Sequence, residues 1–442
     1  MTARAGLLPP ARLDWGRHGL LGLLAMVFAG NFVGRQILAV MVEPIKSEFA
    51  VSDTAIGLIS GLAFAAVYAL MGLPAGRLVD RLPRIRLLAI ACLLWAMATM
   101  FCGLAGSFVA LAVARMLVAV SESPTTSASL SLIADLYPPQ RRSFAISCFT
   151  AAPTFSSIIG LSVGAWVVEH YGWRSAFIAL GMPALVFSTI LAFFVRDPQR
   201  GRWDVTPHAA AQPALLGIGA ESRNLLALPA YRCLILAGGL ATLSSYAVGM
   251  WNTSFLVRSH GLSLQHAGLL VGLTCGICAG IGGLFSGWLS DRLCSRDPHW
   301  QVSIPVLGHL AAVCALVPYL LWSDSILLRL GDVPIPGAML WCALYSFFAV
   351  WWVAPSYNLV SQLVPPGRRG TAMALQTIVS TLLGVGVGPL VTGLFSDLLL
   401  PLFGQESLRY SLLLVNLPVI CAVLLLVRTA RHASATGYRH PG

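Results

Sequence analysis

Long apolar segments alternate with short polar segments along almost the whole chain. About 20 consecutive apolar residues are enough for a helix to cross the hydrocarbon core of a bilayer. The chain is therefore expected to be an all-α integral membrane protein. The pattern predicts twelve transmembrane helices, near residues 17–42, 54–79, 85–106, 108–136, 142–170, 174–196, 230–257, 263–291, 300–323, 336–363, 370–400 and 406–428.

The segment 197–229 interrupts this pattern because it is polar, contains prolines and is too long for a tight turn. We interpret it as a cytoplasmic linker between two halves of the chain. The halves are predicted to be an N-terminal six-helix bundle, residues 1–196, and a C-terminal six-helix bundle, residues 230–442.

Short sequences recur at matching places in the two halves. GRLVDR at 76–81 matches GWLSDR at 287–292, and LYPPQRRSFA at 136–145 matches LVPPGRRGTA at 363–372. Parallel six-helix repeats are a known transporter architecture, with the substrate site between the repeats near the middle of the membrane. The recurrence predicts two pseudo-symmetric bundles arranged in that way.

Composition and charge agree with a membrane location. Hydrophobic residues make up 57% of the chain, charged residues only 10%, and the mean hydropathy is +0.79. Soluble domains contain about 25% charged residues, so a soluble protein is excluded. The net charge of +11 comes mostly from arginines in the loops on the side of both termini. This bias predicts cytoplasmic termini, and we expect the inner (plasma) membrane of a bacterium.

Several functional classes lack their signatures. The chain has no H-E-x-x-H motif and no nucleophile elbow, which argues against an enzyme, and no phosphate-binding loop, which argues against a primary pump. The polar residues are too unevenly placed for a channel. The ten cysteines are scattered in apolar segments and are interpreted as packing residues. We expect a monomer with no cofactor, no metal and no nucleic-acid partner, while a non-transporting receptor or scaffold stays open.

One carboxylate, Glu122, is predicted to lie in the middle of the fourth helix, where a charge is costly. Thr125, Thr126 and Ser129 follow it at helical spacing and form one polar face. Glu122 either pairs with a neighbouring helix to set packing or faces a water-filled path and takes part in transport. Only the second role would make it a proton-binding residue.

Two arginines are also predicted inside the membrane. Arg35 has Asn31 one turn before it on the same face, and Arg115 lies two turns before Glu122. Arg35 is expected to contact an anionic ligand or to pair with Glu122, and both a functional and a structural role stay open for Arg115. Three acids at helix ends are expected to be solvated: Glu43, Asp135 and Glu169.

The second half has no clear charge near the middle of its predicted helices, and the polar groups there are neutral. The candidate substrate contacts are Asn252, Asn358, Gln362 and Gln376. Aromatic residues such as Tyr246, Trp351 and Trp352 lie nearby. A cavity with a charged wall from the first half and a mostly apolar wall from the second fits an amphiphile with an acidic head.

The sequence GRLVDRLPRIR, residues 76–86, resembles the loop between helices two and three of the major facilitator superfamily, with Pro83 where glycine is usual. Physically, Gly76 lets helices approach closely and Asp80 can cap or pair across a helix end. The resemblance implies that this loop latches the outward-facing state. The residues of the implied latch are Gly76, Asp80, Arg81 and Arg84, with Asp291 and Arg292 in the second half.

A narrower resemblance, over essentially the whole chain, is to the spinster-like branch of this superfamily. It lies in RQIL (35–38), EPIKSEF (43–49), SDTAIGLISG (52–61), Trp95, Thr99, SLIADLYPPQRR and GWRSAF. The chain departs from the branch at Gly34, where the branch has an aspartate, and at Ala119, Ser121 and Ser123 around Glu122. The resemblance implies proton coupling through that aspartate and the glutamate, so the departure puts coupling in doubt.

Together these observations predict a secondary active or facilitative transporter that works by alternating access. The expected substrate is a small amphiphilic or lipid-like organic anion, with proton coupling through Glu122 left open. A multidrug efflux carrier of the same fold is the alternative.

Overall fold

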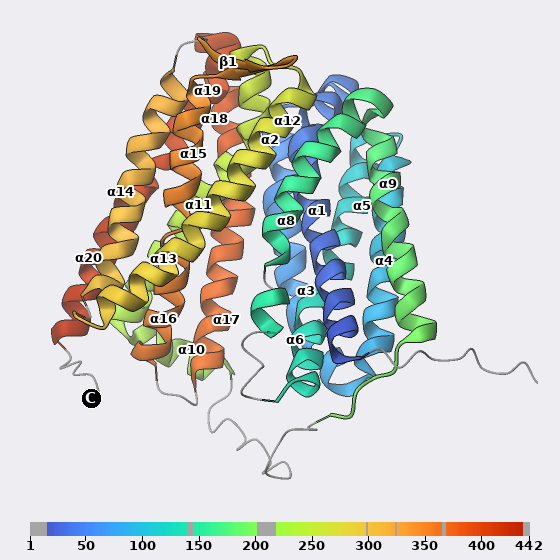
Figure 1. Ribbon diagram of the computed structural model, residues 1–442, viewed down its shortest axis with the longest axis vertical. Coiled ribbons are helices and arrows are strands. Elements are labelled where there is room, and N and C mark those ends of the chain that lie inside the picture. Colours follow the sequence, from blue (N-terminus) through green and yellow to red (C-terminus); the bar gives the residue numbers. More distant parts are fainter. Residues whose placement is uncertain are drawn as a thin grey trace, which may run out of the picture. The chain divides into compact units, whose positions relative to one another are not determined.

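The computed structural model describes residues 16–138, 145–149, 151–200, 218–297, 299–322, 325–364 and 368–435. Nearly all of these residues are helical (Figure 1). The first half contains α1 (Arg17–Phe49), α2 (Asp53–Gly57), η1 (Leu58–Leu62), α3 (Ala63–Arg81), α4 (Arg84–Gly103), α5 (Phe108–Glu122), α6 (Thr125–Leu136), α8 (Ala152–Ile158), η2 (Ile159–Val163) and α9 (Gly164–Phe194).

The second half begins with α10, which lies within the predicted linker. Its helices are α10 (Ile218–Ala227), α11 (Pro229–His260), α12 (Leu264–Leu273), η3 (Thr274–Cys278), α13 (Ala279–Cys294), α14 (Trp300–Leu321), α15 (Ala338–Ala349), α16 (Val353–Leu363), α17 (Arg369–Ser380), η5 (Thr381–Val387), α18 (Gly388–Phe403), η6 (Gly404–Glu406), α19 (Ser407–Asn416) and α20 (Pro418–Ala435).

Within the described residues, ten helical segments are long and apolar enough to cross a membrane. Two of them, Ala145–Phe194 and Thr371–His432, contain 50 and 62 residues. A helix of 50 residues would be about 75 Å long, more than twice the hydrocarbon thickness. The positive φ angles of Gly172 (80°) and Gly404 (56°) turn the chain within these two segments. With each of them counted as two crossings, the ten segments are consistent with the predicted twelve helices, and the prediction of an all-α membrane fold is confirmed.

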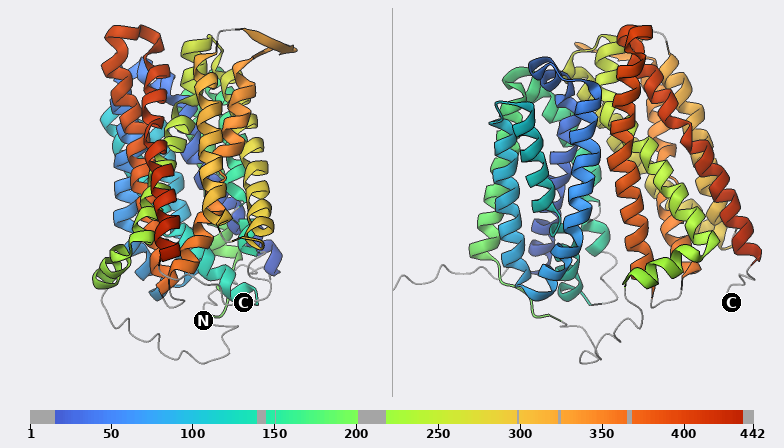
Figure 2. Two further views of the ribbon diagram at one scale, coloured as in Figure 1. Left: turned by 90° about the vertical axis from the view of Figure 1, so that its left-hand side faces the viewer. Right: turned by 180° about the vertical axis from the view of Figure 1, so that it is seen from behind.

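Three local features differ from the pattern-based expectation. The predicted helix 108–136 is interrupted after Glu122, because Pro124 has no N–H to continue the hydrogen-bond ladder. A second interruption separates α15 from α16. The strands β1 (Ile326–Leu330) and β2 (Val333–Pro336) form an antiparallel hairpin beyond the helix ends, which the sequence pattern did not predict (Figure 2).

Wider, π-type turns occur at corresponding places in the two halves. They are η1 and η3 in the second crossing of each half, and η2 and η5 in the fifth. Such turns widen a helix locally and are frequent at functional sites. Their recurrence adds a structural counterpart to the sequence repeat.

The chain folds into two compact units. The first unit consists of the described residues of 1–34, 70–153 and 174–208, and the second of those of 35–69, 154–173 and 209–442. The first has its apolar core where the start of α1 packs with α4, α6 and the end of α9. In the second, α11 packs along α20, α17 and η5 around two smaller cores. These units follow spatial contacts and not the repeat, so the bundle boundaries 1–196 and 230–442 stay a prediction.

Candidate functional site

Arg35 lies in the second unit, against two aromatic rings of the second crossing. Its guanidinium carbon is 5.3 Å from the ring centre of Phe64 and 4.8 Å from that of Tyr68. The two rings are stacked at 6.2 Å and lie one turn apart, because Phe64 and Tyr68 are four residues apart on α3. A cation over the face of an aromatic ring is stabilised by the quadrupole of the ring. This arrangement presents a fixed positive charge beside an aromatic surface.

In the first unit, Arg115 and Asn31 are buried as the sequence pattern predicts, with 2% and 4% of their surfaces exposed. Arg115 Nη1 donates a hydrogen bond of 3.3 Å to the backbone carbonyl oxygen of Gly34. The arginine of α5 is therefore brought to the position on α1 where the spinster-like resemblance implies a carboxylate.

Glu122 is the last residue of α5 and is 1% exposed. Thr125 and Ser129 of the same predicted face are also buried, and Thr126 is half-buried. The break at Pro124 leaves this polar face intact and away from water. Because Arg35 and Glu122 belong to different units, their predicted pairing stays a prediction.

Asn252, in α11, has its amide occupied inside the second unit. Its Nδ2 contacts the sulfurs of Cys342 and Cys275 at 3.6 and 3.8 Å, and its Oδ1 accepts a hydrogen bond from the Tyr319 hydroxyl. Ser346 donates to the same Cys275 sulfur at 3.4 Å. These contacts join α11, η3, α14 and α15, so they account for Asn252 as an internal connection between helices.

The other neutral candidates lie on α16 and α17. Gln376 is buried and its Nε2 donates to the Ser356 hydroxyl at 3.2 Å. Gln362 Nε2 is 3.4 Å from Asn358 Oδ1, and Asn358 is exposed. Of these three, Gln376 alone is enclosed by the helices of its own unit.

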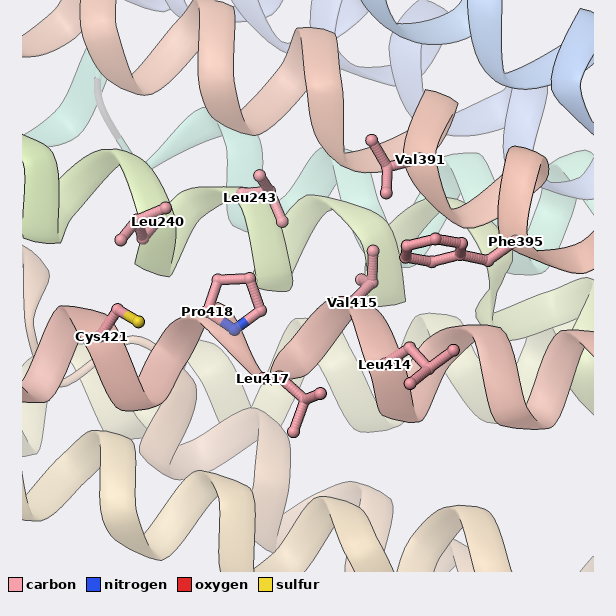
Figure 3. Close-up of a pocket in the computed structure, with 9 residues that line it drawn as sticks. All are labelled: Leu240, Leu243, Val391, Phe395, Leu414, Val415, Leu417, Pro418 and Cys421. Atoms are coloured by element: carbon pink, nitrogen blue, oxygen red, sulfur yellow. The ribbon is translucent and has the colours of Figure 1, made fainter.

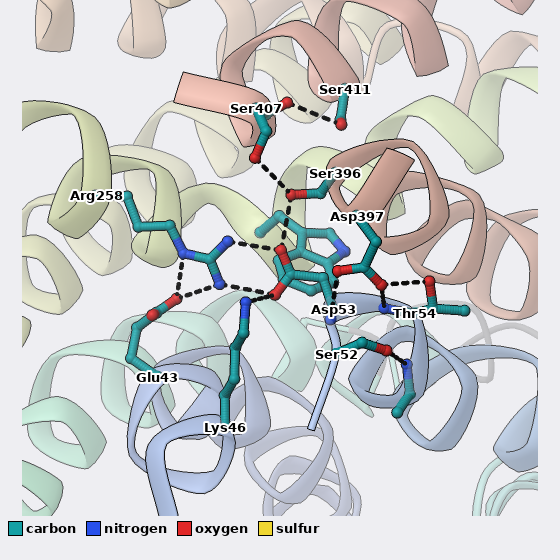
Figure 4. A network of polar contacts seen from close by, with 12 residues as sticks. Glu43, Lys46, Ser52, Asp53, Thr54, Arg258, Ser396, Asp397, Ser407 and Ser411 are labelled. Carbon is teal, nitrogen blue, oxygen red and sulfur yellow. Dashed lines mark hydrogen bonds and ion pairs between the residues drawn. The ribbon is translucent and has the colours of Figure 1, made fainter. Parts of the chain in front are cut away.

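An ion-pair network that the sequence did not indicate surrounds Asp53, at the start of α2 (Figure 4). Asp53 is 2% exposed and accepts two hydrogen bonds from Arg258, at 2.7 and 2.9 Å. Lys46 and Ser396 each donate to it at 2.7 Å. Arg258 also donates to Glu43 at 2.8 Å. Residues of the first half, 43–53, are thereby tied to the end of α11 and to α18.

A second carboxylate, Asp397 of α18, caps the N-terminus of α2. It accepts hydrogen bonds from the backbone N–H groups of Asp53 and Thr54, at 3.0 and 2.8 Å, and from the Thr54 hydroxyl at 2.6 Å. A negative charge is favourable here because the first N–H groups of a helix have no partner within it. The capping group of a first-half helix thus comes from the second half.

Glycines allow the backbones behind this network to approach closely. A Cβ atom on Gly57 would lie 2.5 Å from the Pro389 carbonyl oxygen, and one on Gly61 would lie 2.5 Å from that of Gly386. A Cβ atom on Gly393 would lie 2.3 Å from the Asp53 carbonyl oxygen. These distances exclude any side chain, so α2 and η1 are packed backbone to backbone against η5 and α18. We call these contacts and the ion-pair network together the Asp53 closure.

The expectation that the acids at helix ends are solvated is wrong for two of the three. Glu43 pairs with Arg258, and Asp135 pairs with Arg84. Glu169 is exposed as expected. A cavity of about 340 Å³ lies next to the closure and is lined by Glu43, Lys46, Val257, Arg258, Leu400, Gly404, Gln405 and Ser407.

Of the implied latch residues, Arg84 has the most contacts. It is 1% exposed and pairs with Asp135 through Nη1 and with Asp197 through Nη2, the latter at 3.1 Å. Arg200 donates to the carbonyl oxygens of Val79, Asp80 and Leu82 at the end of α3. The first residues after α9 are therefore fastened to the 76–86 loop, a connection that the sequence analysis missed.

The remaining latch residues are less enclosed. Asp80, Arg81, Asp291 and Arg292 are exposed, and Arg292 lies over the Trp288 ring at 5.5 Å. Among the described residues, no atom would lie within 4 Å of a Cβ atom on Gly76. The expectation that Gly76 permits a close helix approach is therefore wrong for this conformation.

One hollow in the second unit is apolar. It measures about 440 Å³ and is lined by Leu240, Leu243, Val391, Phe395, Leu414, Val415, Leu417, Pro418 and Cys421 (Figure 3). No charged side chain is among these nine, so an acidic head group has no partner there. Nor do the described residues bring three His, Cys, Asp or Glu side chains together as a metal site would require.

Comparisons with known proteins place these features in a family. The family model described as Major Facilitator Superfamily matches residues 24–389. An MFS-type efflux pump of Mycolicibacterium smegmatis is 32% identical over 436 residues, which is 96% of this chain and 97% of that protein. A sphingosine-1-phosphate transporter of Danio rerio is 25% identical over 439 residues, 92% of this chain and 83% of that protein.

Among solved structures, the chain is similar to a bacterial homologue of the human lysosomal transporter spinster in an inward-facing, unoccupied conformation. The TM-score is 0.86 at 24% identity, over 97% of this chain and 100% of that one. A Xenopus tropicalis spinster homologue is 24% identical over 425 residues, 90% of this chain and 78% of that protein. The resemblance to the spinster-like branch is confirmed by these similarities.

Proposed function

Since the chain belongs to the Major Facilitator Superfamily, it is an integral membrane transporter of a small molecule and not an enzyme, and we propose that its substrate is an amphiphilic organic anion. The observation that carries this proposal is the position of Arg35. Its guanidinium lies against the Phe64 and Tyr68 rings, so one site offers a charge for an acidic head and an aromatic surface for an apolar body.

The similar proteins support the same substrate class and an outward direction. One is a sphingosine-1-phosphate transporter, whose substrate has a phosphate head on a single apolar chain. Another is an efflux pump. We therefore propose export of a single-chain lipid-like acid, from a bacterial inner membrane in which both termini are cytoplasmic.

We propose that the Asp53 closure is one of the two gates of alternating access. It joins first-half residues 43–61 to second-half residues 258 and 386–397 through charged hydrogen bonds and close glycine contacts. A carrier must break such contacts as a set to open on that side, because a packed interface has discrete arrangements and does not deform continuously. For the gate on the other side of the membrane, we propose that the 76–86 loop is the latch. Its contacts are made by Arg84, Asp197 and Arg200.

A second candidate, export of neutral or cationic xenobiotics, is favoured by the 32% identity to the efflux pump. The two candidates make different demands on Arg35. A xenobiotic carrier needs no fixed cation at this position, whereas a carrier of acids does.

Purified protein in liposomes tests the proposal. We expect concentration-dependent flux of sphingosine 1-phosphate above that of protein-free liposomes, and no comparable flux of its alcohol, sphingosine. Binding of the acid without any flux would identify a receptor or scaffold. Equal flux of the acid and of a cationic dye would favour the xenobiotic carrier.

A further inference from the structure

Two cysteine side chains meet inside the second unit, Cys275 from η3 and Cys342 from α15. Asn252 Nδ2 contacts both sulfurs, that of Cys342 at 3.6 Å and that of Cys275 at 3.8 Å. The two thiols are also hydrogen-bond partners of each other. The two sulfurs therefore lie side by side, although they belong to different crossings of the membrane.

The polar groups around the pair hold both sulfurs in position. The Tyr319 hydroxyl donates to Asn252 Oδ1, and this contact turns the donating Nδ2 of the same amide toward the sulfurs. The Ser346 hydroxyl donates to the Cys275 sulfur at 3.4 Å. A cysteine that only fills space behaves as a small apolar residue and needs no such donors. Side chains from α11, α14 and α15 are thus arranged around the two thiols.

Both side chains are free thiols, and they differ in how far an oxidant can reach them. Cys275 is half-buried, whereas Cys342 is fully enclosed, with 0% of its surface exposed. Oxidation of cysteines follows exposure, and redox-sensitive cysteines are often placed next to a second thiol that resolves the oxidised product. Cys275 is therefore the thiol that an oxidant reaches first, and Cys342 is in place to react with it next.

We propose that Cys275 and Cys342 form an oxidation site, at which a hydroperoxide converts the two thiols into a disulfide between η3 and α15. The Cys275 sulfur attacks one peroxide oxygen, and the O–O bond breaks. Cys275 becomes a sulfenic acid, while the other oxygen leaves with the thiol proton as water or an alcohol. The Cys342 sulfur then attacks the Cys275 sulfur, the S–S bond forms, and the sulfenic hydroxyl leaves with the Cys342 proton as water. The two thiols lose two electrons, and the peroxide gains them.

The consequence is a covalent link that thiols can undo, because a disulfide is reduced by exchange with an attacking thiolate. The link fastens η3, one of the π-type turns, to the neighbouring α15 and so holds two crossings of the second half together. It does not depend on which molecule the protein transports.

The test treats the purified protein with hydrogen peroxide, denatures it in N-ethylmaleimide to block the remaining thiols, and digests it for mass spectrometry. We expect peptides joined by a Cys275–Cys342 disulfide, with the reduced forms of both cysteines falling together at least tenfold. Dithiothreitol should restore both. Cys92, a buried thiol of the first unit with 2% exposure, is the matched control and should stay reduced.

Two variants test the order of attack. In Cys342→Ser the oxidised Cys275 lacks its resolving thiol, and we expect a sulfenic acid that dimedone traps. Cys278→Ser removes the other sulfur of η3 and should leave the Cys275–Cys342 disulfide unchanged. The proposal is overturned if Cys275 joins Cys278 instead. It is also overturned if Cys275 and Cys342 stay reduced at a peroxide concentration that oxidises the exposed cysteines, which are Cys148, Cys314 and Cys421.

Discussion

At the scale of single residues, a polar or charged side chain enclosed by membrane helices is costly and needs a partner or a function. The sequence pattern located Asn31, Arg115 and Glu122 in buried positions, since each is surrounded in sequence by apolar residues at helical spacing. It did not indicate Asp53 or Arg258. Both lie at helix ends, where a charged residue normally meets water. They are also partners of each other at a separation of 205 residues, which a local sequence pattern does not reveal.

Proton coupling is a prediction at this scale. Glu122 is an acid enclosed within the membrane helices, and we expect it to exchange protons during transport. We expect Glu122→Gln to abolish any response of flux to a pH gradient while downhill flux remains measurable. The measurement is substrate flux in proteoliposomes with and without an imposed gradient.

The matching change is Gly34→Asp, whose Cβ atom would make only ordinary van der Waals contacts with Trp95 and Leu180. It adds a second in-membrane carboxyl group and should strengthen the dependence of flux on the gradient. If wild-type flux ignored the gradient and Glu122→Gln behaved as wild type, Glu122 would be a packing residue and the protein a facilitator.

At the scale of helices, the apolar runs predicted the membrane crossings but not the irregular turns or the strands. Most helix ends lie within about three residues of the predicted ones, because a run of about 20 apolar residues has few alternatives to a membrane helix. The exceptions are α1 and α20, which end at Phe49 and Ala435, beyond the predicted 42 and 428. The π-type turns and the hairpin 326–336 were missed. A π-type turn depends on the neighbouring helix, and the hairpin strands are short and mostly exposed.

The cap on α2 gives a prediction for the Asp53 closure. Asp397→Ala removes the acceptor of the first two N–H groups of α2, and losing a cap of this kind costs about 1–2 kcal/mol. We expect amide hydrogen exchange of residues 53–57 to become roughly 5–30 times faster, as that free energy implies. Asp291→Ala, at an exposed acid of the second half, should leave this exchange unchanged. Equal exchange in wild type and Asp397→Ala would show that the carboxylate does not hold α2.

Arg84 gives a prediction for the 76–86 loop. Arg84→Gln leaves Asp135 and Asp197 without their cation in an enclosed site, and breaking a buried ion pair in this way costs about 3–5 kcal/mol. We expect a clear fall of the thermal midpoint. Arg86→Gln, two residues away and exposed, is the control and should change the midpoint little. Similar midpoints for the two variants would contradict the role given to Arg84.

At the scale of the whole molecule, the orientation that we propose in the membrane rests on the placement of the arginines. Arg296, before α14, is expected to be cytoplasmic, and Asp332, in the turn of the hairpin after α14, is expected on the outside. We expect a membrane-impermeant maleimide to label Asp332→Cys on intact cells and Arg296→Cys only after permeabilisation. Wild-type protein controls for native cysteines, and the opposite labelling would invert the topology.

The central claim is that Arg35 recognises the acidic head of an amphiphilic substrate. The most direct measurement is the initial flux of sphingosine 1-phosphate in proteoliposomes, compared between wild type and Arg35→Gln. A charged hydrogen bond contributes about 1.5–3 kcal/mol, so the account predicts a loss of roughly 10- to 100-fold in Arg35→Gln. We expect the flux of sphingosine, which lacks the acidic head group, to be low in both proteins. Undiminished flux of the acid in a folded Arg35→Gln protein would contradict the claim.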